Sequence, residues 1–157
     1  MGRILVTGGA GFIGSHFVDW LVPHGDDRIV VLDKLTYAAD LRNLEQSRDD
    51  IEFVQGDITD PEDLATVFAD GVDAVVHFAA ETHVDNSIGA PLVFAETNMV
   101  GTLRLAMFAV EHSVERFLYV STDEVYGSRA EGCFREEDRH LPSSPYAASK
   151  SGGEKLV

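Results

Sequence analysis

The chain has 157 residues, of which 45% are hydrophobic, which is enough for one domain with a buried core but not for two. Its formal net charge of -15 would repel a phosphate backbone, so nucleic acid is not expected as a partner. No stretch reaches the ~20 apolar residues of a membrane span, and the N-terminus lacks the features of a signal peptide. These observations predict no membrane association and a cytoplasmic location.

Acidic residues are spread along the chain in no single block, whereas lysine occurs only at Lys34, Lys150 and Lys155. Salt screens the mutual repulsion of such a dispersed acidic surface. We therefore hypothesise a halophilic source with a high-salt cytoplasm. The single cysteine, Cys133, has no second thiol to pair with and is interpreted as inert.

Short apolar runs alternate with longer amphipathic ones, which predicts βαβ units around a parallel sheet. The predicted fold class is therefore α/β, a Rossmann-type doubly wound parallel sheet, with residues 1–157 forming one dinucleotide-binding domain. The predicted elements in chain order are a strand at 3–7, a helix at 12–21, strands at 28–33 and 51–55, a helix at 61–68 capped by Asp60, a strand at 74–78, a helix at 91–112 and a strand at 116–121.

The polar, turn-rich segment 128–145 is predicted to be a surface loop. A last helix is predicted to begin near Tyr146 and to be still running at Val157, because no C-cap glycine or other stop signal precedes that residue. We interpret this ending as a cut, so that the fold is truncated before a substrate-binding portion.

A glycine-rich turn joins the first predicted strand to the first predicted helix. Gly9, Gly11 and Gly14 stand there in G-x-G-x-x-G spacing, which lets backbone amides approach a pyrophosphate at a helix N-terminus. Asp33 ends the second strand about 20 residues after the turn, where a carboxylate accepts hydrogen bonds from adenosine ribose hydroxyls. The pattern predicts a dinucleotide site, and the alternative is a glycine-rich turn without a ligand.

The Asp33 carboxylate would repel a 2′-phosphate, which favours NAD over NADP, although Lys34 beside it weakens that preference. Asp57 and Ile58 follow the third strand, and the segment 78–82 follows the fourth, so both lie at carboxyl ends of the sheet and are candidates to face the cofactor. For Asp57 a loop-capping role is as well supported, and packing alone also explains the alanines of FAAET.

Tyr146 and Lys150 are four residues apart on a predicted helix and therefore lie on one face. An ammonium beside a phenol lowers the phenol pKa from its usual value near ~10, which predicts Tyr146 as a base at neutral pH. A solvated helix face is the ordinary meaning of this spacing, but its position downstream of a dinucleotide motif favours catalysis.

Asp123 and Glu124 follow the fifth predicted strand, at the sheet edge where open α/β sheets bind ligands. Ser121 and Thr122 before them provide hydroxyls for a sugar oxygen. Loss of water across two carbons needs a base for the carbon-bound proton and an acid for the leaving hydroxyl, which two carboxyl groups supply. The alternative is a solvated polar turn. The histidines show no ligand spacing, so no metal is predicted, and His77 is interpreted as a core residue.

The motifs TGGAGFIG, LDKLTYA, GDITD, FAAETHVDNSI, STDEVYG and YAASK occur in this order. Together they resemble the dTDP-glucose 4,6-dehydratases of the extended short-chain dehydrogenase/reductase family, also called the NAD-dependent epimerase/dehydratase family. The resemblance implies an NAD-dependent lyase of nucleotide-sugar metabolism that oxidises C4 of dTDP-glucose or a related sugar nucleotide. Water is then lost across C5 and C6 and the hydride returns to C6, giving dTDP-4-keto-6-deoxy-glucose. A homodimer paired through the helices from Pro91 and Tyr146 is also implied.

The resemblance assigns roles by position. Tyr146 would be the base of the oxidation, Lys150 its electrostatic partner, Thr122 a hydrogen-bond donor to the sugar, Asp123 the acid at C6 and Glu124 the base at C5. Thr82 and Thr122 would contact the substrate. The implied NAD site comprises Gly8, Gly11, Phe12, Ile13, Gly14, Asp33, Lys34, Leu35, Thr36, Asp57, Ile58, Phe78, Ala79, Ala80, Glu81, Thr82, Thr97, Tyr146 and Lys150.

Family members are about twice as long as this chain, and the part that binds the nucleotide of the substrate lies beyond Val157. The resemblance therefore implies a cofactor-binding portion without its C-terminal substrate domain, expected to be inactive alone. Asn86 stands where the family usually has arginine. Two alternatives stay open, namely another NAD-dependent sugar-nucleotide enzyme such as an epimerase or decarboxylase, and a dinucleotide-binding module with no turnover.

Overall fold

The computed structural model describes residues 2–157. Five parallel strands form one sheet in the order β3-β2-β1-β4-β5. The chain order therefore reverses between β1 and β4, which is the switch point where open α/β sheets form a binding crevice. The strands are β1 (Arg3–Thr7), β2 (Arg28–Asp33), β3 (Ile51–Gln55), β4 (Ala74–His77) and β5 (Arg116–Tyr119).

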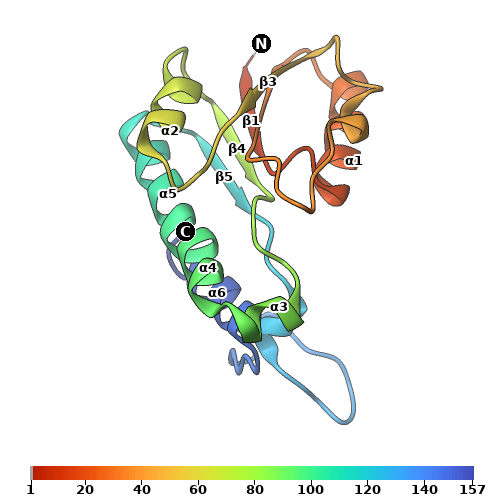
Figure 1. Ribbon diagram of the computed structural model, residues 1–157, viewed down its shortest axis with the longest axis vertical. Coiled ribbons are helices and arrows are strands. Elements are labelled where there is room, and N and C mark those ends of the chain that lie inside the picture. Colours follow the sequence, from red (N-terminus) through yellow and green to blue (C-terminus); the bar gives the residue numbers. More distant parts are fainter. Residues whose placement is uncertain (1) are drawn as a thin grey trace.

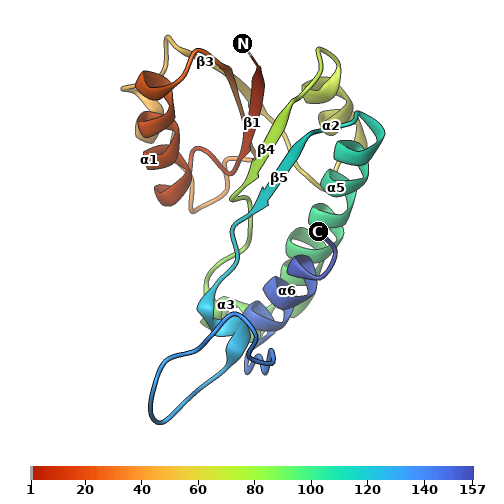
Figure 2. The same ribbon diagram turned by 180° about the vertical axis from the view of Figure 1, so that it is seen from behind.

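Helices cover both faces of the sheet, as the doubly wound prediction requires. Helix α1 lies on one face, and α2 and α5 lie on the other (Figures 1 and 2). A π-helical turn, Glu96–Gly101, joins α4 to α5 without a break. The helices are α1 (Phe12–Leu21), α2 (Pro61–Phe68), α3 (Val84–Gly89), α4 (Pro91–Ala95), α5 (Thr102–Glu111) and α6 (Pro145–Glu154), with short 3-10 turns at Val22–His24, Leu41–Leu44 and Asp123–Tyr126.

Two hydrophobic clusters fill the space between the sheet and its helices. Neighbouring strand residues point to opposite faces, so Leu5 joins the cluster under α2 and α5 while Val6 joins the cluster under α1. Val30 and Val31 of β2 divide in the same way. This alternation explains why the central strands are apolar through their middle, at Ile4–Val6 and Ile29–Leu32, and polar only near their ends.

The strand and helix predictions are confirmed for most of the chain, and the differences are local. β4 and β5 end at His77 and Tyr119, one and two residues before the predicted ends, because the chain leaves the sheet there to line a pocket. Residues 84–89 form α3, which was not predicted, and its N-cap His83 makes no side-chain capping bond that would have marked it. Between the 3-10 turn and α6 the chain forms a loop, as predicted (Figure 1).

Helix α6 corrects the prediction of a helix still running at Val157. It begins at Pro145, where the Ser144 hydroxyl accepts a hydrogen bond from the Ala147 amide, and it ends at Glu154. The Lys155 amide divides its hydrogen bond between the carbonyls of Ser151 and Gly152, which is how helix ends tighten. Two consecutive glycines lower the helix propensity of this last turn.

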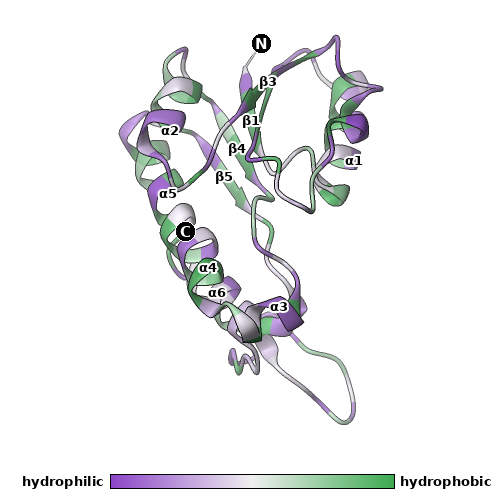
Figure 3. Ribbon diagram, in the orientation of Figure 1, coloured by the Kyte–Doolittle hydropathy of each residue, from purple (hydrophilic) through white to green (hydrophobic). Residues whose placement is uncertain are grey.

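The stretch Pro91–Glu111 overturns a second expectation. With 21 residues it is long and apolar enough, by length and composition, to cross a membrane, so the prediction that no such stretch exists is wrong. In the fold, 33% of its apolar window is buried, and Phe94 and Leu105 lie on the buried side against α6 and the sheet. Hydrophobic segments lie beside hydrophilic ones along this stretch in Figure 3. It is a helix packed against the rest of the fold on one side.

Candidate active site

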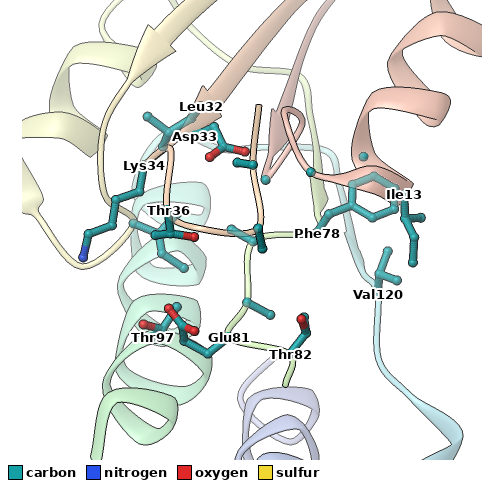
Figure 4. Close-up of a pocket in the computed structure, with 18 of the residues that line it drawn as sticks. Ile13, Leu32, Asp33, Lys34, Thr36, Phe78, Glu81, Thr82, Thr97 and Val120 are labelled. Atoms are coloured by element: carbon teal, nitrogen blue, oxygen red, sulfur yellow. The ribbon is translucent and has the colours of Figure 1, made fainter. Parts of the chain in front are cut away.

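A pocket of about 380 Å³ opens at the carboxyl ends of the strands, next to the switch point between β1 and β4. The turn after β1, the first turn of α1 and the segments after β2, β3 and β4 supply most of its walls, and α6 closes one end with Tyr146 and Lys150. Figure 4 shows side chains from these separate segments converging on one space. The fold thus gathers the predicted motifs at a single site.

The turn between β1 and α1 requires glycine for two separate reasons. Gly8 has φ 71°, and a Cβ there would lie 2.5 Å from the backbone nitrogen of Ala79. A Cβ on Gly14 would collide with the carbonyl oxygen of Gly8. Gly11 is the N-cap of α1 and brings no side chain to satisfy the first amides of the helix. The result is a close-packed cradle with free amides at a helix N-terminus, which fits a diphosphate.

Asp33 is fixed at the end of β2 by two backbone amides. Its Oδ2 accepts a hydrogen bond from Ala10 at 2.9 Å and its Oδ1 from Leu35 at 2.8 Å. The carboxylate is buried but lines the pocket beside the glycine turn. This position suits an acceptor for ribose hydroxyls.

Every predicted cofactor residue lines the pocket except Leu35. Leu35 has φ 59°, and its side chain packs in the hydrophobic cluster under α1. The lining also includes residues that the sequence analysis did not assign to the cofactor. These are Leu32, Ala38, Ala39, Gly56, Val120 and Ser121.

Ala38 and Ala39 reach the pocket because the loop after β2 folds back on the glycine turn, where Gly11 bridges to Ala39. No local sequence pattern signals this tertiary contact. Leu32 and Gly56 belong to the motifs LDKLTYA and GDITD, and Val120 directly precedes STDEVYG, so their places at the ends of strands were predictable from the sequence.

Lys150 is held beneath the pocket by two neighbours. Its Nζ donates a 2.6 Å hydrogen bond to the carbonyl of Val120 and lies 4.2 Å from the centroid of the Tyr119 ring. Burial lowers the pKa of Lys150 to about 8, and Glu154 opposes this shift. Lys150 is therefore still mostly protonated at neutral pH and loses its charge as the pH rises through about 8.

The phenol of Tyr146 differs from its prediction. Burial raises the pKa of Tyr146, the Thr122 hydroxyl opposes the rise, and the charges of Glu124 and Asp123 add to it. Lys150 is not among the causes of this shift, so the predicted lowering of the Tyr146 pKa is wrong in direction. Tyr146 and Lys150 do line one pocket from one helix face, as predicted.

Thr122, Asp123 and Glu124 form the start of the 3-10 turn Asp123–Tyr126. The Thr122 hydroxyl caps this turn by accepting a hydrogen bond from the Glu124 amide at 3.3 Å. Asp123 and Glu124 are exposed and lie outside the pocket lining, yet both carboxylates act on the pKa of Tyr146. Thr122, Asp123 and Glu124 therefore lie close enough to the Tyr146 phenol to influence its pKa.

Asn98 is a residue of this site that the sequence analysis missed. It lies in the π-helical turn and is buried, and such turns are frequent at functional sites. Its side chain accepts from the Glu81 amide at 2.8 Å and donates to the Glu81 carbonyl and to Ser149 Oγ, both at 2.9 Å. Ser149 Oγ in turn donates to the carbonyl of Tyr146 at 2.7 Å. Asn98 thus ties the pocket segment 78–82 to α6.

His77 is a satisfied core residue, which confirms its interpretation. Thr102 Oγ1 donates to the Asn98 carbonyl, so it accepts from His77 Nε2–H at 3.0 Å, and His77 Nδ1 accepts from Thr7 Oγ1 at 2.6 Å. Burial lowers the pKa of His77 to about 3, so the ring is neutral. Among residues 2–157, no group of three His, Cys, Asp or Glu side chains is placed to hold a metal ion.

Known proteins resemble this chain along its whole length. A family model described as GDP-mannose 4,6 dehydratase matches residues 5–157. A dTDP-glucose 4,6-dehydratase of Streptomyces niveus is 50% identical over 99% of the chain and 48% of its own length. The low-salt glycan biosynthesis protein Agl12 of Haloferax volcanii is 49% identical over 98% of the chain and 50% of its own length. The chain spans about half the length of the curated relatives it matches.

Solved structures agree with this similarity. The crystal structure of the dTDP-glucose 4,6-dehydratase DesIV from Streptomyces venezuelae with NAD bound has a TM-score of 0.92 and 50% identity, covering 98% of this chain and 50% of that one. A UDP-Glc/GlcNAc 4-epimerase from Campylobacter jejuni has a TM-score of 0.91 but 31% identity, covering 99% and 48%.

Proposed function

The chain belongs to the family described as GDP-mannose 4,6 dehydratase, and on this basis we propose that it is the NAD-binding part of a dTDP-glucose 4,6-dehydratase. The observation that carries the proposal is the meeting of the two halves of the site. The glycine turn and Asp33 lie at one end of the pocket, and Tyr146 and Lys150 lie at the other, beside the carboxylates of Asp123 and Glu124. We also propose that a C-terminal substrate-binding segment completes the active enzyme.

NAD is the proposed cofactor, and when bound it supplies reversible hydride transfer. The cradle of Gly8, Gly11 and Gly14 would hold the diphosphate through backbone amides. The Asp33 carboxylate would accept hydrogen bonds from the adenosine ribose. The other proposed NAD-binding residues are those that the family resemblance implies and that line the pocket, which excludes only Leu35.

The proposed roles of the side chains follow from their positions around Tyr146. Tyr146 Oη, in its ionised form, takes the proton of the C4 hydroxyl during oxidation, and Lys150 supplies positive charge in the same pocket. Thr122 donates a hydrogen bond to the sugar oxygen. Glu124 removes the C5 proton, and Asp123 protonates the departing C6 hydroxyl, so that water is lost. Thr82, at the exposed rim of the pocket, contacts the sugar.

The test uses this chain joined at Val157 to the C-terminal half of the Streptomyces venezuelae enzyme. We expect a product lighter by one water from dTDP-glucose. Asp123→Asn and Glu124→Gln should each slow water loss by ~10²- to 10⁴-fold while C4 oxidation continues. Glu131→Gln, an exposed glutamate elsewhere in the loop, is the matched control. Dehydration at the parental rate in both variants would remove these carboxylates from the mechanism.

A sugar-nucleotide 4-epimerase is the second candidate function, and the close structural match to the Campylobacter jejuni epimerase favours it. Both candidates begin by oxidising a sugar hydroxyl at the same pocket. The two reactions differ in the next step. Epimerisation gives a product of the same mass as the substrate, whereas dehydration gives a product lighter by one water. Mass analysis of the product of the joined enzyme on dTDP-glucose shows whether water is lost, and chromatographic separation of the epimers shows whether UDP-glucose is converted at unchanged mass.

A homodimer is also proposed. The stretch Pro91–Glu111 presents exposed apolar side chains on its outer side, among them Leu103, Met107 and Val110, and Leu156 after α6 borders them. Burying such side chains gives about 1.5–3 kcal/mol each, and patches of this kind mark association surfaces. Met107→Glu should shift sedimentation of the chain towards monomer, whereas Leu141→Glu, an exposed leucine in the loop, should not. A monomeric parent chain would refute the dimer.

We further propose a cytoplasmic, high-salt setting. The net charge of -15 and the Haloferax volcanii relative support it. The free energy of unfolding should rise between dilute buffer and molar potassium chloride, because salt screens the repulsion among surface carboxylates. Equal stability in the two solvents, measured by urea unfolding, would contradict the proposal.

A further inference from the structure

Lys34 and Asp57 form an ion pair at the adenosine end of the pocket. Lys34 follows β2 and Asp57 follows β3, two strands that are hydrogen-bonded neighbours, so their carboxyl ends lie side by side. The Lys34 Nζ is 2.5 Å from Asp57 Oδ2. Both residues line the pocket, and the exposed fractions of their side chains are 59% and 21%.

Asp57 is the fixed member of the pair. Its Oδ1 accepts a hydrogen bond from the Thr59 amide at 2.9 Å, and its own amide donates to Asp63 Oδ2 at 2.8 Å. The Lys34 side chain is held at its Nζ by the Asp57 carboxylate, which the hydrogen bonds with Thr59 and Asp63 fix in the loop. Asp57 therefore determines where the Lys34 ammonium lies.

Charge at this end of the pocket depends on that pairing. Lys34 and Lys150 are the two cations among the described residues that line the pocket, and Lys150 is bound to Val120 at the other end. Asp33 is held by Ala10 and Leu35, and in Figure 4 the Lys34 side chain extends away from the Asp33 carboxylate. A phosphate on the adenosine ribose would thus meet a fixed carboxylate and no free cation.

The protonation behaviour of the pair agrees with this geometry. The hydrogen bond to Asp57 raises the pKa of Lys34, so its charge persists. Partial burial alone would raise the pKa of Asp57, but the hydrogen bonds from Lys34 and Thr59 outweigh it and the pKa is lowered. Both groups are therefore charged near neutral pH.

We propose that Asp57 is a specificity-determining residue that keeps NADP out by engaging the Lys34 ammonium, which would otherwise be available to a 2′-phosphate. Two carboxylates then act together against NADP. Asp33 repels the 2′-phosphate, and Asp57 holds the Lys34 ammonium that could otherwise bind this phosphate. This inference rests on the proposed NAD site. It also explains how NAD can be preferred although Lys34, a cation that would attract a 2′-phosphate, stands next to Asp33 in the sequence.

Calorimetric titration of this chain with NAD+ and with NADP+ tests the inference. Asp57→Asn should lower the ratio of the NADP+ to the NAD+ dissociation constant by roughly tenfold, since a hydrogen bond to a charged group is worth about that factor or more. The gain should shrink as sodium chloride is raised, because exposed charges are screened. Adding Lys34→Met to Asp57→Asn should return the ratio to the parental value, because the pair is then neutral again.

The control is Asp70→Asn, which makes the same change of net charge at an exposed residue outside the pocket lining. It should leave the ratio unchanged. An unchanged ratio in Asp57→Asn, or a gain that persists in the double variant, overturns this inference but not the NAD site. If the parent chain binds neither dinucleotide, both the inference and the proposed cofactor fail. Lys34→Met alone, at an exposed position, should raise the ratio, so the pair stays testable even if Asp57→Asn unfolds.

Discussion

The side-chain amide of Asn98 and the hydroxyl of Ser149 are joined by a 2.9 Å hydrogen bond that links the π-helical turn to α6. The same amide group holds both the amide and the carbonyl of Glu81. One buried side chain therefore connects the pocket wall after β4 to the helix that carries Tyr146 and Lys150.

Replacing this connection should loosen the pocket as well as the fold. In Asn98→Leu the buried Ser149 hydroxyl and the partly buried amide and carbonyl of Glu81 lose their hydrogen bonds, at a cost of up to about 1–3 kcal/mol each before relaxation. We expect a lower free energy of unfolding in urea and a weaker NAD+ affinity by calorimetry. Asn86→Leu, at an exposed asparagine, is the control and should change neither. An Asn98→Leu chain that binds NAD+ like its parent would show that the link does not position the pocket.

Lys150 should make stability depend on alkaline pH. Its pKa is about 8 in the folded chain against 10.5 in its ordinary state, so between these values the unfolded chain binds the proton and the folded chain does not. The free energy of unfolding should therefore rise with pH from about 8, by at most ~1.4 kcal/mol per pH unit. The raised pKa of Tyr146 opposes the trend only above its ordinary value of 10.

Urea unfolding between pH 8 and 9.5, a range of roughly one to two pH units within that window, measures this slope. Lys150→Met should abolish the rise, and Lys155→Met, which removes an exposed lysine, should keep it. Parallel curves for all three proteins would mean that Lys150 does not titrate differently on folding.

Gly8→Ala should destabilise the chain far more than Gly71→Ala. Both glycines have positive φ, at 71° and 80°, so both substitutions carry the left-handed penalty of about 1–2 kcal/mol. Only at Gly8 does the added Cβ meet backbone, 2.5 Å from Ala79 N, whereas nothing lies within 4 Å at Gly71. Gly8→Ala should therefore lower the melting temperature and the NAD+ affinity more than Gly71→Ala does. Equal losses of stability in the two variants would show that the backbone near Gly8 moves to accommodate the added Cβ.

Asp33→Ala should weaken NAD+ binding and improve the relative affinity for NADP+, because the carboxylate both accepts from ribose hydroxyls and repels a phosphate. Asp33→Asn separates the two effects, since it removes the charge while keeping one oxygen acceptor. Unchanged affinities for both dinucleotides in Asp33→Ala, measured by calorimetry, would refute its assignment.

Much of the fold and site was predictable because the signals are local. The strand ends at Thr7 and Asp33 and the glycine turn follow from periodicity and backbone sterics within a few residues. Residues at the carboxyl ends of parallel strands meet by topology, which is why the lining near Asp57 and Ala79 was anticipated.

The missed features depend on contacts between distant segments. Asn98 shows no pattern in the sequence of its helix, and its partners Glu81 and Ser149 come from two other elements. Leu35 was assigned to the pocket by position, but its left-handed backbone turns the side chain towards α1. The apolar stretch from Pro91 was underestimated because its buried and exposed sides are both hydrophobic, so composition alone did not separate them.

The hydrogen-bonded chain from Thr7 through His77 to Thr102 makes the imidazole a built-in reporter of core opening. Its folded pKa of about 3 lies below the ordinary 6.5, so it contributes stability above 6.5 that is lost as the pH falls towards 3. Protonation at Nδ1 requires the hydrogen bond from the Thr7 hydroxyl, which comes from the neighbouring strand β1, to break. Nitrogen-15 spectra of this one ring, recorded as the pH is lowered, would therefore report when the hydrogen bonds that join β1, β4 and α5 beneath the pocket are lost.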